Sequence, residues 1–218
     1  MTAIDHKDQA PDLSARRAKT RQALLDAGSR LLAEKPIDAI AIDEIVRAAG
    51  VAKGSFFNHF QDKDAFGRAV ARQLRVEIET AVAEINRGIE DPARRVVRSV
   101  CLYVRHASHH PRRASVLLRV SSGLSQAEAP LNQGVLDDVS KGLLDGRFSV
   151  PTAEAGVLFI LGVGQMALAR VVREPSASLA EALGQQLCSL LLRGLGLQPG
   201  EANQLAAQAA HEVIGGGA

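Results

Sequence analysis

The amino-acid sequence predicts an all-α protein. Apolar residues recur at three- and four-residue spacings along most of the 218-residue chain, and prolines stand at the starts of several of these segments. No alternation of apolar and polar residues persists long enough to predict a strand. Hydrophobic residues make up 46% of the chain and aromatic residues only 3%. The composition is therefore that of a helical chain whose core is built mainly from Ala, Leu and Val.

The N-terminal part contains three predicted helices in a characteristic order. A first helix runs from Ser14 to about Glu34 and ends at Pro36, because proline cannot continue the backbone hydrogen-bond ladder. Two helices, Ile42–Ala49 and Lys53–Phe60, then flank a turn at Gly50, where glycine allows a positive φ. Short helix, tight turn and second helix is the layout of a helix-turn-helix, whose second helix enters the DNA major groove.

Helices are predicted for the rest of the chain as well. Asp62 caps a fourth helix that reaches about Asn86. A loop is predicted over residues 121–130. The later predicted helices are Pro92–His110, Pro111–Ser122, Leu131–Asp145, Pro151–Arg173, Leu179–Leu195 and Glu201–Ile214. We therefore divide the chain into four parts: a disordered arm at residues 1–13, a helix-turn-helix domain at 14–66, a larger helical domain at 67–214 and a flexible tail at 215–218.

Residues 16–66 combine an apolar pattern in the second helix, an Ala-Ala-Gly-Val turn and an aromatic third helix; these residues are Ile42, Ile45, Ala48–Val51, Lys53–Phe57, His59, Phe60 and Lys63. This is a resemblance to the DNA-binding domain of the TetR family of ligand-responsive bacterial repressors. It implies an N-terminal three-helix DNA-binding domain, a larger C-terminal helical domain for ligand binding and dimerisation, and release of DNA on ligand binding. The expected function is that of a dimeric, sequence-specific transcriptional regulator bound to a palindromic operator.

The resemblance and the helix geometry together indicate which residues contact DNA. Side chains at the start and on the outer face of the third helix can reach base edges and phosphates. The candidates are Arg17, Lys53, Gly54, Ser55, Phe57, Asn58, His59 and Lys63. The alternative for Lys53, Ser55 and Asn58 is an ordinary solvated helix face, and Phe56 and Phe60 are expected in the core. The family pattern has capping residues at Ala41 and Ala52 and a tyrosine at Phe57, so this domain is expected to lack two caps and one phosphate contact.

Charge is distributed unevenly behind a net charge of +2. Residues 1–66 hold ten basic and ten acidic residues, residues 67–120 hold eleven and five, and residues 121–218 hold five and nine. DNA affinity must therefore come from placed side chains rather than from bulk charge. The basic excess begins with Arg68, Arg72 and Arg75 on one face of the fourth helix.

A small-molecule effector is expected to bind in the C-terminal domain. Inward-facing arginines would hold an acidic ligand, whereas the alternative is a solvated basic surface. The scarcity of aromatic residues favours an aliphatic or small effector. The candidate ligand residues are Arg98, Leu102, Tyr103, Arg105, Leu118, Phe159 and Met166; each apolar one is also compatible with plain core.

Two of the last helices carry apolar surfaces suited to a homodimer. Residues 156–169 are apolar on every face, and leucines form a heptad-like stripe on the next helix. Two such helices from each subunit would form a four-helix interface across a twofold axis. The candidate interface residues are Phe159, Leu161, Leu183, Leu187, Leu190 and Leu191. The alternative is that they form intramolecular core alone.

No catalytic, cofactor or metal site is predicted. The sequence has no nucleophile elbow, phosphate loop or HExxH motif. A metal-dependent enzyme built on His106 and His110, next to His109, is the least favoured alternative, after a constitutive DNA-binding protein without a ligand. The two cysteines form no CxxC pair, the N-terminus has no secretory signal, and the longest uncharged stretch, residues 155–169, is shorter than a membrane span. A cytoplasmic protein is expected.

Overall fold

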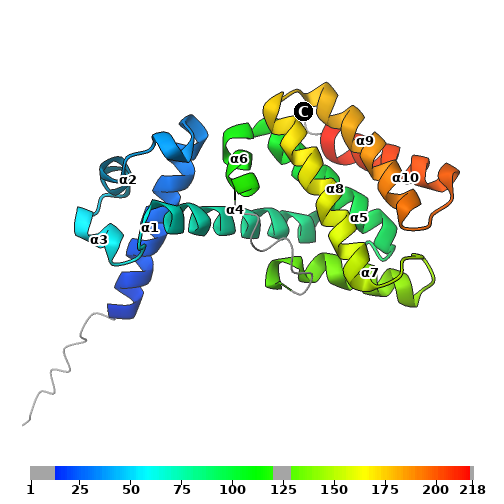
Figure 1. Ribbon diagram of the computed structural model, residues 1–218, viewed down its shortest axis with the longest axis horizontal. Helices are drawn as coiled ribbons and strands as arrows, with labels where there is room; N and C mark the ends of the chain where they lie inside the picture. The colour runs from blue at the N-terminus through cyan, green and yellow to red at the C-terminus, as the bar shows by residue number, and fades with distance from the viewer. Residues whose placement is uncertain (1–12, 120–128, 217–218) are drawn as a thin grey trace, which may run out of the picture.

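The computed structural model describes residues 13–119 and 129–216, and within these ranges it is all-α without a strand. Figure 1 shows two groups of helices at opposite ends of one long connecting helix. Residues 1–12 of the predicted arm, most of the predicted loop at residues 121–130 and the last two residues of the tail lie outside the described residues. Leu13, the last residue of the predicted arm, is already part of the first helix. The all-α prediction is confirmed.

Three helices and the start of a fourth form the N-terminal domain, namely α1 (Leu13–Glu34), α2 (Ile42–Ala49), α3 (Lys53–Phe57) and α4 (Lys63–Ile85). A 3₁₀ turn, η1 (Ile37–Ala39), follows the first of them. Gly50 has a φ of 67° and ends α2, as the sequence predicted. Ala41 and Ala52 occupy the N-cap positions of α2 and α3, and neither makes a side-chain hydrogen bond. Both helices therefore lack a side-chain cap, as the sequence predicted.

The third helix is shorter than predicted. It was expected to reach Phe60 but ends at Phe57, and the Asn58 N–H donates to Gly54 O as the helix closes. The physical reason is that Asp62, with a φ of −153°, already caps α4 by accepting a hydrogen bond from the Ala65 N–H. The chain must turn within residues 58–61, and Phe60 packs into the core from this turn instead of from the helix.

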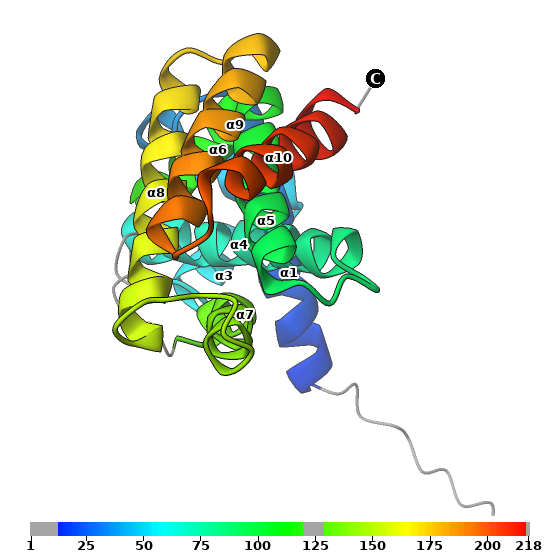
Figure 2. The same ribbon diagram turned by 90° about the vertical axis from the view of Figure 1, so that its right-hand side faces the viewer.

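The C-terminal domain is a bundle around α5 (Pro92–His109). The other elements are α6 (Pro111–Arg119), η3 (Pro130–Asn132), α7 (Gln133–Leu144), α8 (Ala153–Arg173), α9 (Ala177–Gly194), α10 (Pro199–Ala210) and the terminal π-helical turn η4 (His211–Gly215). Central α5 contacts α7, α8, α9 and α10. Figure 2 shows α8 and α9 side by side on one face of this bundle, with α10 next to α9.

Several helix starts differ from the predictions by two residues. Helix α7 begins at Gln133, after a 3₁₀ turn, and not at Leu131. Helix α8 begins at Ala153 because Thr152 accepts from the Ala155 N–H, and α9 begins at Ala177 because Ser176 accepts from the Leu179 N–H. In each of the last two cases a hydroxyl cap, rather than the first apolar residue, sets the start of the helix.

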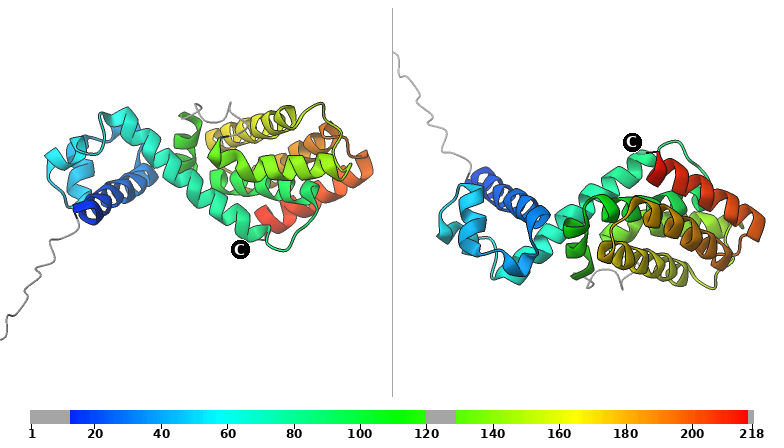
Figure 3. Two further views of the ribbon diagram at one scale, coloured as in Figure 1. Left: turned by 90° about the horizontal axis from the view of Figure 1, so that it is seen from below. Right: turned by 90° about the horizontal axis from the view of Figure 1, so that it is seen from above.

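Helix α4 belongs to both domains. Phe66, Val70 and Ala71 are part of the N-terminal apolar cluster, whereas Leu74 and Ile78 belong to the C-terminal one. The expected boundary after residue 66 therefore falls inside a continuous helix. Figure 3 shows α4 extending from the N-terminal helices along the C-terminal bundle in two further views.

Helix α8 is long and apolar enough to cross a membrane by length and composition. The helix has 21 residues and is therefore longer than the uncharged stretch, residues 155–169, from which the sequence predicted no membrane span. The same helix contacts α5, α6, α7 and α9. One apolar helix packed in a bundle is weak evidence for a membrane span, because the core helix of a soluble protein has the same composition.

Candidate DNA-binding helix and effector cavity

Helix α3 is held by aromatic packing and presents a polar surface. Phe56 is fully buried, and its ring centroid lies 5.5 Å from that of Phe60 and 5.4 Å from that of Phe66. The Arg21 guanidinium lies 5.4 Å from the centroid of the Phe60 ring. This packing fixes which side of α3 faces outward, so the expectation that Phe56 and Phe60 are core residues is confirmed.

The predicted DNA contacts gather around the exposed side of α3. Lys53, Gly54 and Asn58 are exposed, Ser55 is half-buried, and 52% of Phe57 is exposed although it is a large apolar residue. The Lys53 ammonium lies 2.8 Å from a carboxylate oxygen of Asp43, and both side chains are well exposed. An exposed ion pair of this kind is weak, so the Lys53 side chain is available to a phosphate or base.

Three further candidates border α3 from neighbouring elements. Arg17 of α1 donates a long hydrogen bond of 3.4 Å to the Asn58 carbonyl, and Lys63 donates one of 2.8 Å to the Asp38 carbonyl. Burial, followed by the positive charges of Arg17 and Arg21, lowers the pKa of His59, so its imidazole is neutral near pH 7. The structure therefore places seven of the predicted residues on α3 or directly beside it, whereas Lys63, at the start of α4, is engaged by the Asp38 carbonyl of η1.

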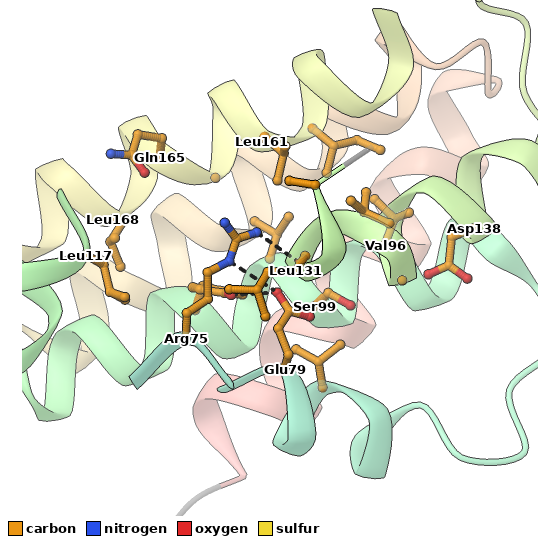
Figure 4. Close-up of a pocket in the computed structure, with 18 of the residues that line it drawn as sticks. Arg75, Glu79, Val96, Ser99, Leu117, Leu131, Asp138, Leu161, Gln165 and Leu168 are labelled. Atoms are coloured by element: carbon orange, nitrogen blue, oxygen red, sulfur yellow. Dashed lines mark hydrogen bonds and ion pairs between the residues drawn. The ribbon is translucent and has the colours of Figure 1, made fainter. Parts of the chain in front are cut away.

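A cavity of about 530 Å³ lies between α4, α5, α7 and α8. Helix α6 contributes Leu117, and η3 closes one side with Pro130 and Leu131. Its walls are mainly apolar, and Figure 4 shows Leu117, Leu161 and Leu168 around the space with a few polar side chains among them. A volume of this size suits a small organic molecule.

One buried polar network crosses the cavity wall. The Tyr103 hydroxyl of α5 donates a 2.7 Å hydrogen bond to Glu79 Oε1 of α4. The Arg75 guanidinium lies 3.8 Å from the same oxygen and donates to the Leu131 carbonyl at 3.2 Å (Figure 4). It also donates to Asn132 Oδ1 at 2.5 Å. Burial raises the pKa of Glu79, against the opposing effects of Tyr103 and Arg75, and burial also raises the pKa of Tyr103.

A second ion pair lies in the same wall. Arg95 Nε is 2.5 Å from Asp138 Oδ1, and Arg95 Nη1 donates to the carbonyls of Asn86 and Ile89. Burial raises the pKa of Asp138, whereas the hydrogen bond from Arg95 opposes that shift. The two inner acids of the cavity are thus each paired with an arginine.

Among the predicted ligand residues, Tyr103 lines this cavity and six others lie elsewhere. Arg98 pairs with Glu212 and donates to the Ile85 carbonyl, and Arg105 donates to the Val213 carbonyl. Both arginines therefore tie α5 to other parts of the chain. Leu102 is buried in the core, Leu118 packs against the same core, Phe159 is 40% exposed and Met166 is 65% exposed. Not one of these six belongs to the lining of the described cavity.

The sequence-based list missed the polar residues that do line the cavity. Arg75 and Glu79 come from α4, and Ser99, Asp138 and Gln165 come from three other helices. One signal in the sequence could have pointed to them. Arginines recur on one face of α4, and the last of these, Arg75, stands four residues before Glu79. That spacing indicates a shared face, but it does not say whether the face is covered by a second helix.

The predicted dimer residues separate into three groups. Leu190 and Phe159 are exposed on α9 and α8, next to exposed Leu158 and Met166. Leu183 and Leu187 are half-buried, and Leu161 lines the cavity. Leu191 is fully buried in its own subunit, so it is a core residue and is not free to meet a partner. The leucines of α9 therefore do not all face outward, because one side of this helix packs against α5 and α10 within the same subunit.

The histidine and cysteine residues of the described ranges form no metal site. Among the described residues there is no group of three His, Cys, Asp or Glu side chains that could hold a metal ion. Burial, aided by nearby His110 and positive charges, lowers the pKa of His106 to about 4, and its Nε2 has no hydrogen-bond partner within the described part. The Cys101 and Cys188 sulfurs lie 3.8 Å apart as buried free thiols.

Comparison with known proteins now identifies the chain. Residues 24–70 match a family described as bacterial regulatory proteins of the tetR family, and residues 91–208 match the tetracyclin repressor-like C-terminal domain. The chain belongs to the TetR family. It is thus a member of a family of bacterial transcriptional regulators.

Individual relatives agree with this assignment. An uncharacterized HTH-type transcriptional regulator of Haemophilus influenzae is 30% identical over 115 residues, which cover 52% of this chain and 56% of that protein. The match therefore spans about half of the curated relative.

Solved structures of regulators share the fold over most of the chain. RolR with resorcinol is 23% identical, with a TM-score of 0.70 over 89% of this chain and 96% of that one. A TetR-family regulator from Pectobacterium atrosepticum is 21% identical, with a TM-score of 0.67 over 85% and 98%. FadR from Bacillus subtilis with stearoyl-CoA is 16% identical, with a TM-score of 0.60 over 79% and 98%. At these identities the likeness concerns the fold alone.

Proposed function

We propose that this TetR-family regulator is a dimeric, cytoplasmic repressor that binds a palindromic operator through α3 and leaves it when a small effector enters the cavity. One observation carries the proposal: α4 packs against the exposed, polar helix α3 near its N-terminal end, and the same continuous helix lines a largely apolar cavity farther along. A constitutive DNA-binding protein would have no use for such a cavity.

DNA contact is assigned to the exposed side of α3 and its neighbours. Lys53, Ser55 and Asn58 are placed to reach base edges and phosphates, while Arg17 and His59 lie beside them. Phe57 supplies an apolar contact without a hydroxyl donor. Gly54 has no heavy atom within 4 Å of where a Cβ would stand, so it keeps the backbone open to the DNA. Lys63 would have to leave Asp38 to reach a phosphate.

Dimerisation is assigned to the exposed apolar face of α8 and α9. Leu158, Phe159 and Met166 on α8 and Leu190 on α9 form a surface that would be covered by the same helices of a second subunit. A twofold arrangement places two α3 helices about one DNA turn, roughly 34 Å, apart, which matches a palindromic operator.

Coupling between the cavity and DNA is assigned to α4 and α6. Arg112 of α6 donates to the carbonyls of Ala33 and Glu34 at the end of α1, and Val116 of α6 packs into the N-terminal apolar cluster. Leu117, the next residue, lines the cavity. A ligand that shifts α6 or α4 would therefore change the position of α1 and, with it, of α3.

The ligands of structural neighbours support an organic effector. RolR was solved with resorcinol and FadR with stearoyl-CoA, so this architecture accepts organic molecules of very different size. The test is fluorescence anisotropy with labelled DNA from upstream of the chain's own gene and its neighbours. Selective, salt-sensitive binding is expected, whereas equal affinity for any sequence would overturn the operator assignment.

A further inference from the structure

We propose that the effector is an elongated organic carboxylate, whose apolar body fills the cavity and whose carboxylate is held by Arg68 and Arg72. This inference rests on the proposed function and names the chemical class of its effector. It depends on the shape of the cavity, on the state of the charges inside it and on the two arginines at one end.

The cavity extends along α4. Its lining residues on that helix run from Arg68 to Ala83, which corresponds to about 22 Å of helix axis at 1.5 Å per residue. A space drawn out along a helix in this way suits an elongated ligand better than a compact one.

The interior offers an apolar wall without an uncompensated charge. Arg75 is engaged by Glu79 and Asn132, and Arg95 is engaged by Asp138. A charged ligand group placed here would have to separate one of these buried pairs, which is strongly unfavourable. The remaining wall is mostly aliphatic and suits a hydrocarbon body; it includes Val82, Val96, Val100, Val135, Ile160 and Leu168.

Arg68 and Arg72 are the exception among the basic residues of the cavity. They lie one turn apart on α4, both line the cavity, and both are exposed. Within the described ranges no carboxylate lies at ion-pair distance from either guanidinium, in contrast to Arg75 and Arg95. Two neighbouring guanidinium groups repel each other and bind a carboxylate through paired N–H donors, so an anion relieves the repulsion.

This position also connects the effector to DNA binding. Phe66 and Val70, which flank Arg68 on α4, belong to the apolar cluster that holds α3 through Phe56. A carboxylate bound at Arg68 and Arg72 would thus act on the segment of α4 nearest the DNA-binding domain.

The proposal is tested by calorimetry on the full chain without DNA, with straight-chain carboxylates from hexanoate to dodecanoate below their micellar concentrations. Affinity is expected to rise about three- to fourfold for each added methylene until the chain fills the cavity. Decanoate should bind at least tenfold more tightly than 1-decanol. Equal binding of the alcohol and the acid would overturn the proposal, as would binding of resorcinol but of no carboxylate.

Two variants locate the carboxylate. Arg68→Gln combined with Arg72→Gln should weaken decanoate binding at least tenfold and leave 1-decanol binding unchanged. Arg87→Gln is the matched control, because Arg87 is an exposed arginine just beyond α4 and outside the cavity lining. Unchanged decanoate affinity in the double variant would rule out the assignment. Since these titrations contain no DNA, a failure of operator binding would refute the proposed function and leave the test of the ligand class intact.

Discussion

The Tyr103 hydroxyl donates a 2.7 Å hydrogen bond to Glu79 Oε1 and thereby joins α5 to α4 inside the cavity. Glu79 also faces Arg75, which holds η3 through Asn132 and the Leu131 carbonyl. The network thus connects α5, α4 and η3 through Glu79 and Arg75. Its loss would leave the partly buried Glu79 carboxylate without a hydrogen-bond donor, which would destabilise the folded state.

Replacement of Tyr103 by Phe should destabilise the protein by about 1–2 kcal/mol, because Glu79 loses its hydroxyl donor while it stays partly buried. Urea unfolding at pH 7 measures the change. DNA binding without a ligand should be unaffected, since Tyr103 lies in the C-terminal bundle. An unfolding midpoint equal to that of the wild type would show that the hydrogen bond contributes nothing to the cavity wall.

Replacement of Lys53 by Ala should weaken operator binding by about 1–3 kcal/mol if its side chain meets a base, and Asn58→Ala should do the same. The folded state should be unaffected, because the ion pair of Lys53 with Asp43 is exposed. Anisotropy titrations with operator DNA give the affinities, and circular dichroism checks the fold. Glu154→Ala, at an exposed site on α8, serves as the control. Full operator affinity in both variants would remove α3 and its C-cap, Asn58, from the interface.

Replacement of Leu190 by Glu should convert a dimer into a monomer, because it places a charge on the exposed apolar face of α9. Sedimentation velocity measures the mass directly. Leu144→Glu is a matched control, because Leu144 is 87% exposed at the end of α7 and belongs to neither α8 nor α9. A wild-type chain that sediments as a monomer at micromolar concentration would contradict the dimer proposal itself.

The stability of the protein should fall as the pH decreases from 6.5 to 4, in part through His106. Its pKa in the folded state is about 4 and its ordinary value is 6.5, so in this range the unfolded chain takes up a proton that the folded chain refuses. The contribution is below about 1.4 kcal/mol per pH unit, because the ring is not fully buried.

His106→Gln should reduce this dependence on pH, and urea midpoints measured between pH 4 and 7.5 would show it. His211→Gln is the control, since the His211 side chain is 82% exposed. An identical pH profile for His106→Gln and the wild type would contradict the assignment of this slope to His106.

The DNA-binding domain could be predicted in detail because its signals are local. Gly50 marks the turn, Asp62 caps α4, and the spacing of Phe56 and Phe60 indicates their core positions. Each of these depends on residues within a few positions along the chain. The early end of α3 was missed because the cap at Asp62 requires the chain to turn within residues 58–61, so Phe60 reaches Phe66 from this turn and not from the helix.

The effector cavity could not be predicted residue by residue, because its wall is made by helices that are distant in sequence. Arg98 and Arg105 are surrounded by apolar residues in sequence, but they bind Glu212 and the Val213 carbonyl on the C-terminal segment. Leu191 continues the leucine stripe, yet it faces the core of its own subunit. Only the packing of α5 against α9 and α10 decides these orientations.

The central claim is that α3 recognises a specific DNA sequence. The most direct measurement is to incubate the full chain with fragmented DNA of its source genome, recover the bound fragments and sequence them. The account predicts enrichment of a few sites that share a palindrome with half-sites about one helical turn apart, and loss of this enrichment for Lys53→Ala combined with Asn58→Ala. Recovery of all fragments in equal proportion, unchanged by the double variant, would contradict it.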